Sequence, residues 1–98
     1  MKDATLGGYL REHERPPAFR GGDGHSYTVE ILVEDLGIEA GADWRAYLFF
    51  VKWSGNEPVG HVESSYLASG LTEEAARATL EELTLHEVRE VLDGLVSG

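Results

Sequence analysis

Residues 44–53 restrict the fold of this chain more than any other segment, because both faces of the strand they predict are apolar. Successive residues of a strand point to opposite faces. One face would carry Ala46, Leu48 and Phe50, and the other Tyr47, Phe49, Val51 and Trp53. This pattern is typical of a central strand that is covered on both sides. A chain of 98 residues has one modest core, so the second face needs a cover from the N-terminal segment, a helix or a partner.

Two further strands are predicted on either side of this segment in the sequence. Residues 26–33 alternate apolar and polar side chains, which predicts a strand with one buried face. Residues 54–57 contain a glycine and an asparagine and predict a hairpin turn into a third strand over residues 58–66. We therefore expect a three-stranded antiparallel sheet.

Two helices are predicted in the last third of the chain. Thr72 is a suitable N-cap for the first helix, and acidic residues follow it where the helix dipole favours negative charge. Thr84 and Glu87 have the spacing of a capping box at the start of the second helix. We expect Gly94 to fray or end that helix near its last turn. We expect an α+β fold in which two C-terminal helices pack on one face of the sheet.

Residues 1–24 predict an extended N-terminal arm, and residues 25–98 a single α+β domain. Glycines at 7–8 and at 21–24 look like flexible joints on either side of the arm. Pro16 and Pro17 force extended backbone between these joints. Whether the arm docks on the domain is left open by the sequence.

The charge of the chain is strongly unbalanced. The net charge is −10, and all of it lies in residues 25–98, which hold four basic and fourteen acidic side chains. Such a body repels DNA and RNA, whose binding depends on lysine and arginine, and it attracts basic partners. The chain has no cysteine and no apolar run long enough for a membrane span. We expect a cytoplasmic protein that binds neither nucleic acid nor membrane.

The sequence contains no complete catalytic motif, and it predicts no catalytic residue, no metal ligand set and no cofactor. The one constellation that would support an enzyme is His61, Glu63 and His86, since His61 and Glu63 share a strand face and His86 lies on a helix. Three such ligands would suit a small metal-dependent hydrolase. This is the alternative to a non-enzymatic function.

Three short segments resemble the strand signatures of chromodomains: YTVEI at 27–31, FFVKWSG at 49–55 and HVESSYL at 61–67. The resemblance implies three curved strands with a C-terminal helix, and binding of methylated-lysine peptides in an aromatic cage. Tyr27 and Trp53 would stand at two cage positions, and Asn56 at the third. The chain departs from the family pattern at Val62, where a tryptophan is usual, and at Ser64, where a proline is usual.

A second resemblance involves GLTEEA at 70–75, which is similar to the strand-to-helix junction of HicB-type antitoxins. The resemblance implies a protein that neutralises a partner protein. The spacing between Thr72 and Ala75 is one residue shorter than in that family.

The sequence favours a small acidic protein-interaction or regulatory module without enzymatic activity. Its aromatic strand face and its negative charge would recognise a basic protein segment or a second copy of the chain, and aromatics framed by acids suit cationic ligands. The candidate binding residues are Tyr27, Tyr47, Phe49, Trp53 and Glu63.

Overall fold

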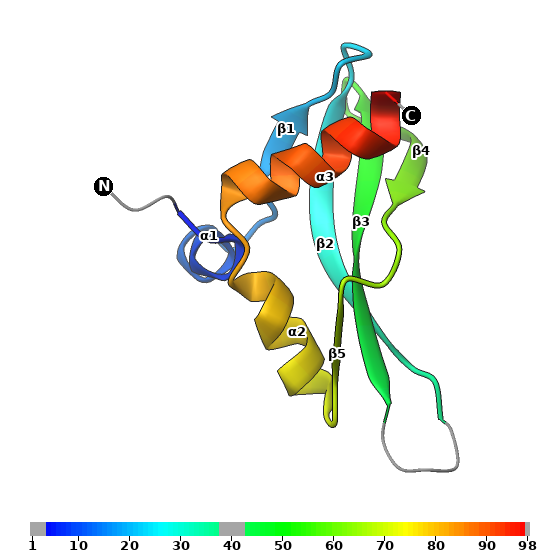
Figure 1. Ribbon diagram of the computed structural model, residues 1–98. Coiled ribbons are helices and arrows are strands. Elements are labelled where there is room, and N and C mark those ends of the chain that lie inside the picture. The colour runs from blue at the N-terminus through cyan, green and yellow to red at the C-terminus, as the bar shows by residue number, and fades with distance from the viewer. Residues whose placement is uncertain (1–3, 38–42, 98) are drawn as a thin grey trace.

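A computed structural model describes residues 4–37 and 43–97, which fold into an antiparallel sheet with helices on one side (Figure 1). In chain order the elements are α1 (Leu6–His13), β1 (Ala18–Arg20), β2 (Ser26–Asp35), β3 (Trp44–Ser54), β4 (Glu57–Glu63), β5 (Ala68–Gly70), α2 (Glu73–Glu81) and α3 (Leu85–Ser97). The predicted α+β class is confirmed. The described part of the chain has five strands and three helices, where the sequence predicted three and two. None of these helices is long and apolar enough to cross a bilayer.

The strand that the sequence predicts to be central lies inside the sheet. The strand order is β1-β2-β3-β4, and β5 also pairs with β3. One edge of β3 pairs with β2 over residues 44–53. The other edge is shared, because β4 pairs with residues 49–54 and β5 with residues 44–46. The sequence predicted one continuous third strand over residues 58–66, but the chain leaves β4 at Glu63 and returns to β3 as the short β5.

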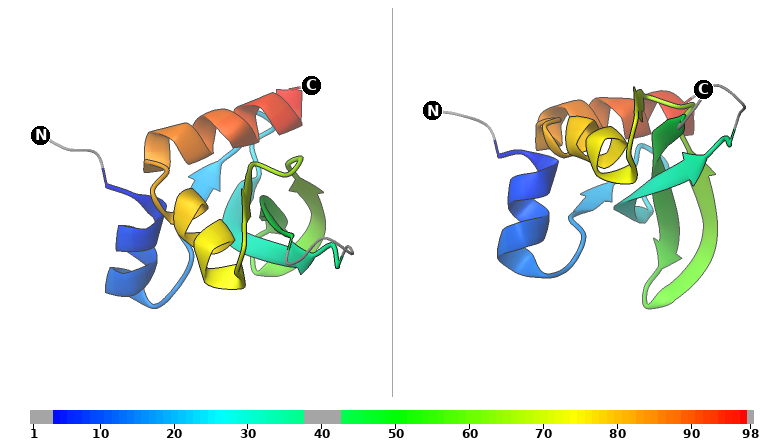
Figure 2. Two further views of the ribbon diagram at one scale, coloured as in Figure 1. Left: turned by 60° about the horizontal axis from the view of Figure 1, so that its bottom comes forward. Right: turned by 90° about the horizontal axis from the view of Figure 1, so that it is seen from below.

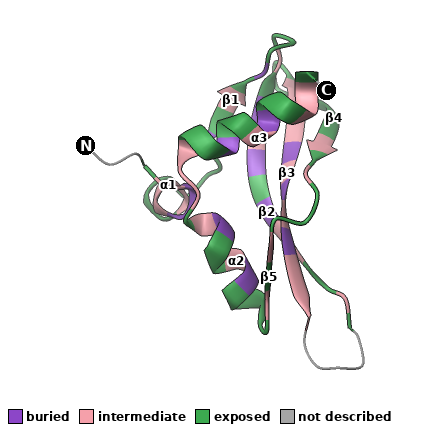
Figure 3. Ribbon diagram, in the orientation of Figure 1, coloured by how far each residue is buried: buried purple, intermediate pink, exposed green. Residues whose placement is uncertain are grey.

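The core lies between the helices and one face of the sheet, which we call the inner face. Figures 1 and 2 show the three helices on the same side of the strands, and Figure 3 shows buried residues on both layers. The buried side chains from the strands are Tyr27, Val29, Ile31, Ala46, Leu48 and Phe50, and those from the helices are Leu6, Ala76, Leu80, Val88 and Leu92. Burying an aliphatic or aromatic side chain stabilises the fold by about 1.5–3 kcal/mol, so this cluster is the main source of stability.

The opposite face of the sheet, the outer face, has no helix packed on it within the described residues. Its side chains belong to the odd-numbered residues of β3 and to their cross-strand partners. They include Tyr47 and Phe49, which lie beside Leu32 and Glu30 of β2. These apolar side chains are partly buried rather than fully buried. In the part of the chain that the structure describes, neighbouring residues of the sheet therefore provide their cover, and no second layer does.

The N-terminal segment is not an extended arm, because residues 5–20 form α1 and β1. The Thr5 hydroxyl caps α1 by accepting a hydrogen bond from the Gly8 amide at 3.0 Å. Leu6 is fully buried in the core, and its amide donates to the Leu83 carbonyl at 2.8 Å. Pro16 and Pro17 lie between α1 and β1 and belong to neither element. The expected boundary at residue 24 therefore does not separate the core from the segment before it.

Two glycines that look like flexible joints are instead positions of close packing. A Cβ atom on Gly7 would lie 2.7 Å from the Cβ of Glu81, so glycine lets α1 approach α2. A Cβ on Gly21 would lie 2.6 Å from the ring of Tyr27. Both distances are too short for non-bonded carbons, so glycine is required at these positions by sterics and not by a need for flexibility.

The two predicted helices begin where the sequence indicates. Thr72 caps α2 by accepting from the Ala75 amide. At the start of α3 the Glu87 amide donates to the Thr84 hydroxyl at 3.0 Å, and the Thr84 amide donates to the Glu87 carboxylate at 2.9 Å. This confirms the capping box. Gly94 lies in the last turn of α3, which continues to Ser97 and packs its apolar stripe on the core.

Candidate functional site

A row of apolar side chains along β3, the outer row, occupies the outer face of the sheet. It consists of Tyr47, Phe49, Val51 and Trp53. The Phe49 ring stacks on the His61 ring of β4, with centroids 4.9 Å apart and an interplanar angle of 18°. The Trp53 indole nitrogen donates to the Thr28 hydroxyl at 2.9 Å. The rings are thus held by neighbouring strands, with one side left towards solvent.

Three carboxylates stand beside the outer row. Glu30 and Glu63 are the cross-strand partners of Phe49 on its two sides, and Glu34 lies further along β2 opposite Arg45. Within the described residues, no ion pair joins any of the three to a basic side chain. Arg45 is bound by Asp43 instead, with hydrogen bonds of 2.8 and 3.2 Å to its carboxylate. The outer face is therefore acidic.

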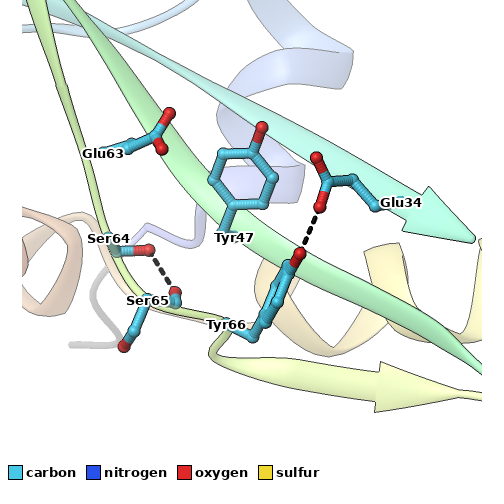
Figure 4. A pocket seen from close by; sticks show the side chains of 6 residues that line it. All are labelled: Glu34, Tyr47, Glu63, Ser64, Ser65 and Tyr66. Atoms are coloured by element: carbon cyan, nitrogen blue, oxygen red, sulfur yellow. Dashed lines mark hydrogen bonds between the residues drawn. The ribbon is translucent and has the colours of Figure 1, made fainter. Parts of the chain in front are cut away.

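A cleft of about 450 Å³ lies at one end of the outer row (Figure 4). It is lined by Glu34, Tyr47, Glu63, Ser64, Ser65 and Tyr66. In Figure 4 the Tyr47 ring stands between the carboxylates of Glu63 and Glu34. The rings of Tyr47 and Tyr66 meet edge to face, with centroids 5.9 Å apart and an interplanar angle of 75°. The cleft combines two aromatic walls with two carboxylates, and its volume is in the usual range for ligand sites.

Hydrogen bonds fix one side of this cleft. The Tyr66 hydroxyl donates to the Glu34 carboxylate, although Tyr66 itself is exposed. The Ser64 hydroxyl accepts from the Leu48 amide at 3.0 Å and donates to the Ser65 carbonyl at 2.7 Å. Ser64 thus fills the gap between β4 and β5 along the edge of β3, and it positions the segment that carries Tyr66.

The carboxylates influence both tyrosines of the cleft. Desolvation, together with the charges of Glu34 and Glu63, raises the pKa of Tyr47 above its usual value. The hydrogen bond to Glu34, followed by desolvation, raises the pKa of Tyr66. Arg45 acts in the opposite direction on the pKa of Tyr66. The charge of Glu34 contributes to both shifts in part, and that of Glu63 to the shift of Tyr47, because a negative potential disfavours a second negative charge. The same potential favours a cation.

The structure brings together four of the five residues that the sequence predicts for binding. Tyr47, Phe49, Trp53 and Glu63 share the outer face. Tyr27 lies on the inner face, is 2% exposed and donates its hydroxyl to Asp23 at 2.6 Å. We therefore exclude Tyr27 from the binding surface.

The placement of Tyr27 also bears on the chromodomain resemblance. Cross-strand register pairs Tyr27 with Lys52, and Trp53 with Ser26. Neighbouring residues of a strand point to opposite faces, so Tyr27 and Trp53 do not line a common cage in this structure.

The three residues of the hydrolase alternative do not meet. His61 and Glu63 lie on the outer face, while His86 lies on α3, with its ring 3.8 Å from the Glu90 carboxylate. In residues 4–37 and 43–97, no group of three histidine, aspartate or glutamate side chains has the geometry to hold a metal ion. His61 instead stacks on Phe49, so nothing in the geometry favours this alternative.

Sequence reasoning missed part of the cleft. Glu34 falls in the loop predicted after the strand of residues 26–33, and Tyr66 falls at the end of the strand predicted over residues 58–66. Glu34 and Tyr66 are 32 residues apart, and only the return of the chain at β5 brings them together. The alternation that starts at Glu30 could have placed Glu34 on the outer face, but no local signal indicates the position of Tyr66.

No known protein family, curated protein or solved structure matches the chain. The resemblances to chromodomains and to HicB-type antitoxins therefore stay predictions.

Proposed function

We propose that this protein is a non-enzymatic interaction module that binds a basic segment of a partner protein on the outer face of its sheet. The observation that supports this most strongly is the outer row itself. Partly buried aromatic side chains, uncovered by any helix of the described chain, lie beside Glu30, Glu34 and Glu63. Aromatic residues are enriched in protein interfaces.

Charge decides which partner fits. Glu30, Glu34 and Glu63 have no basic partner within the described residues, so lysine or arginine from another chain would complement them. A second copy of this chain would bring a further net charge of −10, which opposes self-association at low salt. A basic segment is therefore the occupant that the surface favours.

Two charge-reversal variants test the location of binding. The outer-face variant carries Glu30→Lys and Glu63→Lys, and the helix-face control carries Glu12→Lys and Glu82→Lys. All four positions are exposed, and both variants change the net charge by the same amount. A basic partner should bind the control but not the outer-face variant, because only the latter changes the charge beside the outer row.

The assay uses Trp53 as its reporter. The chain has two tryptophans, so Trp44→Phe leaves Trp53 as the only one. Titration with a twelve-residue lysine-rich peptide should change its fluorescence saturably, and less so in 1 M salt than in 0.1 M salt, because screening lengths fall from about 10 Å to about 3 Å. Equal binding by the two charge-reversal variants would contradict the proposal. Sedimentation provides a second test. If the wild-type protein sedimented as a dimer and the outer-face variant as a monomer, the result would contradict the proposal and favour self-association.

A further inference from the structure

The cleft beside Tyr47 offers a more specific recognition device than the outer row as a whole. We infer that it accepts one lysine side chain of the bound segment, with the ammonium between the tyrosine rings and the carboxylates of Glu34 and Glu63. This inference rests on the proposed function, because it names the group that the same face selects.

The two carboxylates of the cleft only accept hydrogen bonds, and the Tyr47 and Ser65 hydroxyls can accept as well as donate. Glu63 has no ion pair within the described residues, and Glu34 receives one hydrogen bond, from Tyr66. The Ser64 hydroxyl donates its proton to the Ser65 carbonyl, so it has no further proton to offer a ligand. A ligand that only donates hydrogen bonds and carries positive charge therefore complements this lining, and an ammonium group has three donors and no acceptor.

The aromatic walls point to the same class of ligand. A cation within about 6 Å of a ring centroid is attracted by the face of the ring. The Tyr47 and Tyr66 rings meet edge to face. The ring that points its edge at the other therefore turns its own faces to the space beside this contact. The methylene groups of a lysine can lie along these rings while its ammonium reaches the carboxylates.

The arrangement of the carboxylates favours lysine over arginine. A guanidinium binds most tightly when it forms two parallel hydrogen bonds in the plane of one free carboxylate. Here the carboxylates of Glu34 and Glu63 lie on either side of the Tyr47 ring (Figure 4), and that of Glu34 is engaged by Tyr66, so a guanidinium could pair in this way with Glu63 alone. Single acceptors in several directions suit the compact ammonium of lysine better than the planar fork of arginine.

Three small probes test this inference on the intact protein by amide chemical shifts. They are the Nα-acetyl amides of lysine, arginine and norleucine, the last of which has an alkyl chain of similar length without a charge. The lysine probe should give the largest saturable shifts at Tyr47 and at residues 63–66. The norleucine probe should give none, because it has no charge to place beside the carboxylates.

Single substitutions then assign the contacts. Glu63→Gln and Tyr47→Leu should each weaken lysine-probe binding by up to about fivefold, which corresponds to the loss of an exposed ion pair or cation–π contact. Matched controls on α1 are Glu12→Gln and Tyr9→Leu, which change the same groups away from the outer face and should leave binding unchanged. Circular dichroism verifies that each variant is folded.

The results separate this inference from the proposed function. Preference for the arginine probe, equal binding of the norleucine probe, or full binding by Glu63→Gln would overturn the lysine assignment. The proposed function would still hold if the lysine-rich peptide bound in those cases and shifted Phe49 and Trp53. If the peptide itself failed to shift the outer row, the proposed function would fail.

Discussion

Replacing Leu6 by alanine tests whether the N-terminal segment belongs to the domain. Leu6 is 0% exposed and lies in the core cluster. Leucine-to-alanine substitutions in cores cost about 2–5 kcal/mol, from lost transfer energy and from the cavity left behind. We expect about 3 kcal/mol here. A small domain has a free energy of unfolding of about 5–15 kcal/mol, so this one side chain would account for a substantial share.

Urea unfolding followed by circular dichroism measures the effect of Leu6→Ala. The midpoint should fall while the slope m stays unchanged, because the loss affects the stability of the native state and not the surface exposed on unfolding. Leu71→Ala is the matched control, since Leu71 is 79% exposed and surface substitutions change stability by less than about 0.5 kcal/mol. Equal midpoints for the two variants would refute the docking of α1 and restore the detachable arm.

Two further predictions concern the packing of α2 and the β1–β2 turn. Gly70→Ala should lower the free energy of unfolding by about 1–3 kcal/mol, because its Cβ would lie 2.8 Å from the Ala76 backbone nitrogen. Gly22→Ala is the control in the same urea assay. It should be neutral, because a Cβ at Gly22 meets nothing within 4 Å. The Tyr27 hydroxyl, ahead of other hydrogen bonds, lowers the pKa of Asp23 from its usual 3.8 to about 2. A carboxylate whose pKa is lower in the folded state stabilises the fold above its unfolded pKa, so stability should fall as the pH drops from about 4 to about 2. Asp23→Asn should reduce that fall, and an unchanged acid profile would show that Asp23 does not contribute to it.

The sequence predicts the middle of the fold well because local patterns determine it. Alternation of side chains locates β2, apolar residues on both faces locate β3, and a capping box locates the start of α3. These signals depend on neighbours within a few residues. The short strands β1 and β5 have only three residues each, which is too few for a periodic pattern, and their pairing is determined by tertiary contacts.

The sequence does not reveal the fold of the N-terminal segment, because glycine has two structural uses. Glycine is favoured where the backbone needs conformational freedom, and also where two backbones approach closely. The sequence alone does not distinguish these uses. Gly7 belongs to the second kind, since it faces Glu81 across the contact between α1 and α2. Thr5 is an N-cap by residue type and in the structure, but Gly7 and Gly8 directly after it favour a joint on the sequence alone.

The candidate site was predictable as a surface but not as a cleft. The exposed face of β3 follows from its two apolar faces and from the presence of only one helical layer. Its acidic border follows in part from the alternation along β2. The cleft additionally needs the chain to leave β4 at Glu63 and to bring Tyr66 back beside Tyr47. That path depends on Ser64, whose hydroxyl and amide bond to Leu48.

The outer row has two roles that experiments must keep apart. Its rings stabilise the sheet through cross-strand contacts, such as the stack of Phe49 on His61, and such pairs contribute about 0.2–1 kcal/mol each. Removing a ring would therefore weaken the fold as well as any binding. The carboxylates of Glu30 and Glu63 are exposed and form no ion pair within the described residues, so their removal costs the fold little. Charge reversal at these two positions therefore separates the two roles. If binding is lost while stability is retained, this face serves recognition and not only folding.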